Sequence, residues 1–154
     1  MSTDMSKAMW EALADSPNVM LGLTGTNDHS EPMRVQLDKD ANSEFWFYTT
    51  TTNRVAKGGP AMVQFSSKGH DLFACISGTL VPETRPEIID KYWSKPVSAW
   101  YEKGKDDPSL LMMRMELKDA EIWTANPSIK GMFKLFTGKQ IDPDEMGDHA
   151  RVNV

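Results

Sequence analysis

The chain has 154 residues and a formal net charge of −5, which indicates a single domain and argues against nonspecific nucleic-acid binding. Its one cysteine, Cys75, excludes an intramolecular disulfide and is expected to be a small buried hydrophobe in a reducing cytoplasm. The three histidines show no zinc-site spacing, so no metal is expected. The sequence shows no signal peptide and no apolar run long enough to span a bilayer. We therefore expect one cytoplasmic domain, residues 1–154, that binds neither nucleic acid nor membrane.

The first half of the chain predicts a helix and then a series of short strands. Residues 3–15 carry apolar side chains at helical spacing, and Ser16 with Pro17 ends that helix. Strands are expected at 18–26, 31–37, 44–49, 61–66 and 72–81, with a helical turn at 53–57. The first three strands are expected to form an antiparallel meander, because their connections are too short for parallel crossovers. Gly78 predicts a bulge or a close backbone approach.

The second half predicts helices, one long strand and a helix near the end. Thr84 and Glu87 have capping-box spacing and predict a helix that Pro96 ends, with a second short helix after it. Apolar and polar residues alternate over 111–118, which predicts the clearest strand, and 121–124 extends it or forms a further strand. A helix is expected between 126 and 138, and 151–154 is a candidate for pairing. About six short strands with helices inserted late predict a mainly β fold, a small antiparallel barrel with flanking helices.

Arg34 is the first candidate binding residue. The strand at 31–37 places Arg34 and Gln36 on the face opposite Met33 and Val35. An arginine on that face is either a solvent-facing charge or a ligand for phosphate, whose oxygens match the guanidinium fork. Gln36 could offer its amide to the edge of a ring.

The hydroxyl-rich stretch from Tyr48 to Arg54 is the second candidate. Hydroxyls and free backbone N–H groups after a strand can form an anion nest, and Arg54 would add charge there. The alternative is an ordinary strand end rich in β-branched residues. An arginine on each of two nearby segments indicates a phosphate held beside a planar ring, as in flavin mononucleotide (FMN).

The aromatic residues of the second half allow two interpretations. Core or dimer-interface packing explains them as a set, and stacking of Trp100 near a bound ring is the alternative. The sequence contains no recognisable nucleophile–base pattern and no glycine-rich phosphate loop. It therefore predicts a binding site without a catalytic residue, as expected where a cofactor supplies the chemistry. The members of the aromatic set are Trp93, Trp100, Tyr101 and Trp123.

The order and spacing of several short motifs resemble the pyridoxamine 5′-phosphate oxidase-like FMN-binding split barrels, and within them the general stress proteins. The resemblance covers nearly the whole chain. It rests on Pro32-Met33-Arg34, Phe45-Trp46-Phe47-Tyr48-Thr49, Ile76-Ser77-Gly78-Thr79, Tyr92-Trp93, Ala99-Trp100-Tyr101, Gly104-Lys105-Asp106-Asp107-Pro108 and Ala120-Glu121-Ile122-Trp123. It implies a six-stranded antiparallel split barrel of the FMN-binding type.

The resemblance also implies a set of flavin contacts and a partner. By position, the FMN contacts are Arg34, Val35, Gln36, Tyr48, Thr49, Asn53 and Arg54. Such barrels usually form homodimers with the flavin at the interface, so the expected partner is a second copy of the chain.

Three departures from the family pattern limit the functional prediction. The turn after Thr49 is one residue shorter than usual, arginine stands where lysine is common, and the substrate-binding tail of true pyridoxamine phosphate oxidases is not recognisable. Vitamin B6 oxidation is therefore not expected. The preferred interpretation is an FMN-binding general stress-type protein acting as a low-specificity flavin-dependent oxidoreductase; the alternative is a non-catalytic flavin carrier, store or redox sensor. The residues do not distinguish FMN from FAD, and scarce histidine disfavours haem.

Overall fold

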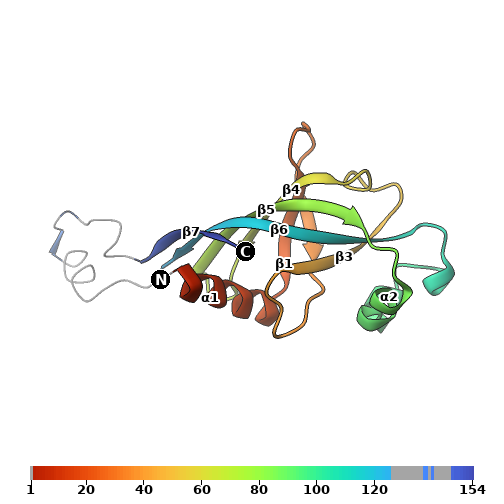
Figure 1. The fold of residues 1–154 in the computed structure, drawn as a ribbon, viewed down its shortest axis with the longest axis horizontal. Coiled ribbons are helices and arrows are strands. Elements are labelled where there is room, and N and C mark those ends of the chain that lie inside the picture. Colours follow the sequence, from red (N-terminus) through yellow and green to blue (C-terminus); the bar gives the residue numbers. More distant parts are fainter. Residues whose placement is uncertain (1, 126–136, 139, 141–146) are drawn as a thin grey trace.

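A computed structural model describes residues 2–125, 137–138, 140 and 147–154 (Figure 1). Its described strands form one seven-stranded antiparallel sheet in the order β2-β1-β4-β5-β6-β3, with β7 added to β6. The strands are β1 Asn18–Leu23, β2 Glu31–Arg34, β3 Glu44–Thr50, β4 Gly59–Ser66, β5 Leu72–Pro82, β6 Leu110–Thr124 and β7 His149–Asn153. The helices are α1 Ser2–Asp15, α2 Pro86–Tyr92, α3 Lys95–Ser98 and the 3-10 turn η1 Gly104–Asp106. The predicted mainly β fold with flanking helices is confirmed, and none of the described helices is long and apolar enough to cross a membrane.

Alternating side chains fill the interior of the curled sheet. On β6, Met113 and Met115 are fully buried, and on the neighbouring β3 the rings of Phe45 and Phe47 meet edge to face 5.5 Å apart. Helix α1 lies against the sheet at the end opposite α2 (Figure 1) and buries the helical face that the sequence predicts, including Leu13. This core is a rigid base for the α2 end of the molecule.

The two ends of the strand order meet at a single point. Strands β1 and β2 pair as predicted, but β3 pairs along its whole length with β6, so the expected three-strand meander is wrong in its third strand. After β2 ends at Arg34, the N–H of Val35 is still donated to the carbonyl of Pro17 on the β1 side at 2.8 Å, whereas every residue of β3 is paired with β6. Only one bridge, Gln36 with Trp46, joins the segment after β2 to β3. The barrel is therefore open along this seam.

Gly78 marks a bulge, as the sequence predicts. The β5–β6 register shifts between Ser77 and Gly78, and a Cβ at Gly78 would lie 2.2 Å from the carbonyl oxygen of Glu116. Beyond the bulge, β6 continues without interruption to Thr124, so 121–124 extends that strand. Pairing at the C-terminal end is also confirmed, because β7 joins β6.

Three local predictions are wrong or incomplete. Helix α2 begins after Arg85, whose side chain makes no capping hydrogen bond, so the expected capping box at Thr84 does not form; Glu83 binds Arg85 instead. Residues 53–57 form two successive hydrogen-bonded turns, from Asn53 to Ala56 and from Val55 to Gly58, where the sequence predicts one helical turn. Cys75 is only half-buried, because it lies on the outer face of β5. The helix expected between 126 and 138 lies almost wholly outside the described residues.

Candidate functional site

A pocket of about 970 Å³ lies where the open seam meets the segment between β5 and β6, residues 83–109, which carries α2 and α3. One wall comes from β2 and the residues after it, a second from the end of β3 and its turn, and a third from the segment that carries α2 and α3. The lining residues are Glu31, Pro32, Met33, Arg34, Gln36, Tyr48, Thr49, Thr50, Asn53, Lys91, Tyr92, Trp93, Ser94, Pro96, Val97, Trp100 and Tyr101. Segments far apart in the sequence thus form one cavity.

Most of the sequence-predicted site residues lie in this pocket. Two do not line it. Val35 is 2% exposed and belongs to the core. Arg54 donates from Nη1 to the carbonyl of His29 at 2.9 Å and lies 3.4 Å from a carboxylate oxygen of Glu31. The predicted residues that the pocket brings together are Arg34, Gln36, Tyr48, Thr49, Asn53 and Trp100.

Arg34 is the cation most available to a ligand. Its side chain is exposed at the pocket, and it makes no hydrogen bond or ion pair with any residue that the structure describes. Arg54, by contrast, already has two partners. A free guanidinium on a pocket wall suits a phosphate or carboxylate, which accepts its paired donors.

The turn after β3 places polar groups next to that wall. The N–H of Asn53 is donated to the carbonyl of Thr50 at 3.0 Å, and Asn53 Oδ1 accepts from the N–H of Val55 at 2.9 Å. The Thr50 and Thr52 hydroxyls lie 3.4 Å apart. The N–H groups of Thr51, Asn53 and Val55 are thus already donated within the protein, so the turn offers the pocket mainly side-chain hydroxyl and amide groups.

Aromatic side chains fix the segment between β5 and β6 to the sheet. The Tyr48 hydroxyl donates to the carbonyl of Ile89 at 2.6 Å, and the Tyr101 hydroxyl donates to the carbonyl of Thr49 at 2.6 Å. The ring of Trp93 lies between, with its centroid 5.8 Å from each of the two tyrosine rings. Burial raises the pKa of Tyr101 to about 12 and raises the pKa of Tyr48 further. Both phenols therefore stay protonated and serve as structural donors.

Trp100 stands apart from this cluster. It is 83% exposed and lies at the pocket rim. Such a large exposed ring can cover a ligand or meet another protein surface.

Sequence reasoning missed the part that α2 contributes. Lys91 reaches across to Asp38, with 2.7 Å between Nζ and Oδ2, and Tyr92 carries a buried hydroxyl without a hydrogen-bond partner among the described residues. Burial and the nearby Asp38 carboxylate raise the pKa of Tyr92. The only sequence signal was the pair Tyr92-Trp93, and that pair predicts core packing equally well.

A buried ionic network beside the pocket was also missed. The carboxylate of Glu83, 1% exposed, lies between Arg85 and Arg114 and accepts the indole N–H of Trp46 at 3.0 Å. Hydrogen bonds from Arg85 hold the pKa of Glu83 well below its usual range, so the carboxylate stays ionised. Glu83 lies outside the pocket lining.

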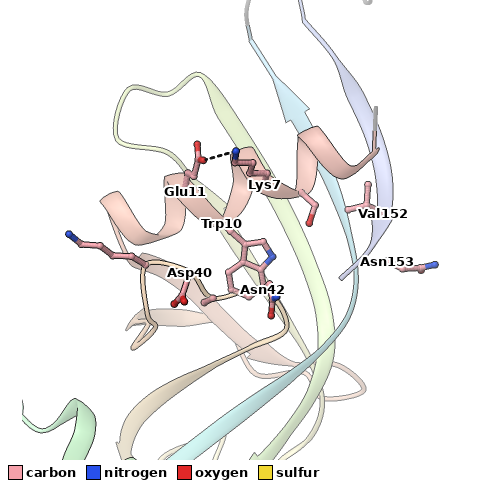
Figure 2. Close-up of a pocket in the computed structure, with 10 residues that line it drawn as sticks. Lys7, Trp10, Glu11, Asp40, Asn42, Val152 and Asn153 are labelled. Carbon is pink, nitrogen blue, oxygen red and sulfur yellow. Dashed lines mark ion pairs between the residues drawn. The ribbon is translucent and has the colours of Figure 1, made fainter.

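A second hollow of about 570 Å³ lies between α1, residues 39–42 and β7 (Figure 2). Lysine and acidic side chains alternate around it, with Lys7 and Glu11 3.9 Å apart, so it presents no charge of one sign. Trp10 forms part of its wall, and its indole nitrogen is buried and has no hydrogen-bond partner among the residues that the structure describes. This hollow therefore offers Lys39 beside Asp40 and Glu11, whereas the larger pocket places Arg34 beside a hydroxyl-rich turn and an aromatic wall. Among the described residues, no cluster of side chains could hold a metal ion.

A family model and several solved structures both indicate the same family for this chain. The model of the family "pyridoxamine 5′-phosphate oxidase like" matches residues 4–142. No curated protein matches the chain. A structure from Xanthomonas campestris pv. campestris, named as a general stress family protein, is 40% identical, with a TM-score of 0.75, covering 84% of this chain and 92% of that one.

Two further solved structures agree. The general stress FMN/FAD binding protein of Xanthomonas citri is also 40% identical, with a TM-score of 0.74, covering 82% of this chain and 93% of that one. A protein from Jannaschia sp. CCS1, named as general stress protein 26, is 28% identical with a TM-score of 0.81 over the full length of both chains. The open antiparallel sheet is thus the split barrel that these proteins share.

Proposed function

Because the chain belongs to the pyridoxamine 5′-phosphate oxidase-like family, we propose that its large pocket binds FMN. The observation that carries this proposal is the unpaired guanidinium of Arg34 beside the hydroxyl-rich turn at Thr50 and Asn53, in a pocket with an aromatic wall. The relative named an FMN/FAD binding protein supports it. The pocket volume of about 970 Å³ lies within the range of about 300–1,000 Å³ that small-molecule and cofactor sites occupy.

The donors present fit a flavin phosphate and ring. Arg34 would hold the phosphate together with groups of the turn at Asn53, and the Gln36 amide would meet a polar ring edge. Thr49 and Tyr48 would form the wall between the phosphate, at Arg34, and the ring edge, at Gln36. Arg54 would reach the phosphate only by giving up its contacts with His29 and Glu31, so we assign it the smaller part.

The flavin would supply hydride or electron transfer, and the protein would supply binding and orientation. We propose a low-specificity flavin-dependent oxidoreductase that acts in the cytoplasm during stress. The alternative is a flavin carrier, store or redox sensor without turnover. It is favoured by two of the three tyrosines that line the pocket, Tyr48 and Tyr101, which burial holds protonated and which already donate to backbone carbonyls.

We propose that the protein acts as a homodimer. Met20, Phe73 and Trp123 are each about two-fifths exposed on one outer face of the sheet, where the register places Phe73 opposite Trp123. An apolar face of this kind suits a second copy of the chain. Trp100, at the pocket rim, is the residue that a partner near the pocket would cover.

The test is the visible absorption spectrum of protein purified from cells, before and after incubation with FMN and removal of the excess. A retained flavin spectrum supports the proposal, and a colourless protein that FMN does not saturate refutes it. Titration of NADH or NADPH then separates the two functions. Steady turnover supports the oxidoreductase, and flavin that neither nucleotide reduces supports the carrier, store or sensor.

A further inference from the structure

Glu83 is the most completely buried carboxylate among the described residues, and it has several donors. Arg85 donates from Nη2 to Oε1 at 2.6 Å and from Nε to Oε2 at 3.0 Å, and Arg114 donates to Oε1 at 3.2 Å. The Trp46 indole N–H is the one uncharged side-chain donor in this set. Two arginines already balance the charge, so charge balance alone does not explain the contact with Trp46.

Trp46 links this network to the pocket in two ways. Its backbone forms the single bridge across the open seam, exchanging N–H to carbonyl hydrogen bonds of 2.7 and 3.0 Å with Gln36. Its ring packs on the ring of Tyr92, with centroids 5.2 Å apart and planes tilted by 32°. Gln36 and Tyr92 both line the pocket, whereas Trp46 and Glu83 do not.

From this geometry we infer that Glu83 is a positioning residue for the ligand pocket and acts through Trp46. The carboxylate fixes the rotation of the indole. The indole in turn fixes the ring of Tyr92, at the end of α2, and the backbone of Gln36 at the seam. The inference rests on the proposed flavin function for its binding readout, and it adds a residue that does not touch the ligand.

The seam makes this control necessary. Elsewhere in the sheet, neighbouring strands are held by ladders of several residue pairs, but at this seam one residue pair carries the whole connection. A ladder fixes its members by redundancy, and a single bridge does not. The β3–β6 ladder holds the backbone of Trp46 on its other side, and the indole hydrogen bond to the buried Glu83 carboxylate adds a fixed orientation of the ring beside the seam.

Four variants test the inference by FMN titration. They are Glu83→Gln, Trp46→Phe, the double variant, and the control Leu13→Ala on the buried face of α1, outside the pocket lining. Glu83→Gln and Trp46→Phe should each raise the Kd for FMN by about fivefold or more, which is less than the roughly 10- to 150-fold of a lost direct hydrogen bond to a charged group because neither residue touches the ligand. The double variant should bind about as weakly as the worse single variant, because both changes remove the same contact. Leu13→Ala lowers stability but should leave the Kd within about twofold of wild type.

A structural role alone predicts a different outcome. If Glu83 only stabilises the fold, Glu83→Gln and Leu13→Ala will affect FMN binding alike. If Glu83 and Trp46 act independently, the two effects will multiply. Either result overturns the inference, as does a Kd for Glu83→Gln within about twofold of wild type.

A second measurement uses the protein without flavin. In ¹H–¹⁵N spectra, Glu83→Gln should shift the Trp46 indole and the Gln36 and Tyr92 backbone amide signals, and Leu13→Ala should leave those signals in place. Unmoved Gln36 and Tyr92 signals overturn the inference. If wild type binds no FMN, the proposed function fails, and these spectra still decide whether Glu83 positions the pocket.

Discussion

Replacing Arg34 by alanine should weaken FMN binding far more than it weakens riboflavin binding. Arg34 is exposed on the pocket wall and makes no hydrogen bond or ion pair with the residues that the structure describes, so a bound phosphate would gain its full donor set. A hydrogen bond to a charged group contributes about 1.5–3 kcal/mol. Since about 1.4 kcal/mol corresponds to a tenfold change in Kd, Arg34→Ala should raise the Kd for FMN roughly 10- to 150-fold. Riboflavin, which lacks the phosphate, should change by less than about threefold.

The same reasoning predicts a smaller effect at Arg54. Its guanidinium is already held by the His29 carbonyl at 2.9 Å and by Glu31 at 3.4 Å. A phosphate would have to replace these contacts, and an exposed ion pair of this kind contributes about 0.2–1 kcal/mol by itself. Arg54→Ala should therefore raise the Kd for FMN by no more than about tenfold.

Quenching of flavin fluorescence in titrations at low and high salt measures both effects. Lys57→Ala removes an exposed cation outside the pocket and is the matched control. The Arg34 effect should shrink as salt rises, because the contact is charged and partly exposed. Equal losses for FMN and riboflavin would show that Arg34 does not hold the phosphate. A larger loss at Arg54 than at Arg34 would show that the phosphate displaces Glu31 from Arg54.

Three further predictions concern stability and assembly. Glu83→Ala should lower the unfolding free energy by about 1–3 kcal/mol in urea titrations, because it removes the acceptor of the Trp46 indole N–H and of Arg85, while Arg114 keeps Glu116 and Glu44. Since hydrogen bonds hold the folded pKa of Glu83 below its ordinary 4.5, this difference should be complete above pH 4.5 and shrink as the pH falls further; a difference that grows in acid would contradict the assignment. Gly78→Ala should cost at least about 1–3 kcal/mol in the same assay, because its Cβ would lie 2.2 Å from the Glu116 carbonyl, and an unchanged midpoint would mean that the bulge can move. Phe73→Glu with Trp123→Glu should convert the proposed dimer to a monomer by light scattering, and an unchanged mass would place the interface elsewhere.

Local pattern was sufficient where one face of a strand is buried. The alternation from Leu111 to Leu117 predicts the central part of β6, and Gly78 predicts the bulge, because both are consequences of sterics within a few residues. The position of β3 was not predictable in this way. Short connections favour pairing of β3 with the preceding strand, β2. In the structure, β3 makes seven pairs with β6 and a single bridge with the segment after β2, and the sequence carries no local signal for the pairing with β6. A prediction from neighbouring segments therefore fails where distant strands compete.

The candidate site divides along the same line. Arg34, Gln36 and Asn53 were predicted from polar residues on a strand face or in a turn, and they line the pocket. Lys91 and Tyr92 were not, because α2 reaches the pocket only through tertiary contacts, including the ion pair with Asp38. The partners of Arg54 also lie outside local reach, since they come from the far end of the β1–β2 turn.

The edge formed by β2 bears on the colloidal behaviour of the protein. An open seam leaves a strand with only one neighbour, and such an edge can recruit strands from other molecules during synthesis or under heat. Pro32 has no N–H to offer such a strand, and the charge of Arg34 two residues later opposes close stacking. Pro32 and Arg34, which line one side of the pocket, thus also oppose aggregation through this edge.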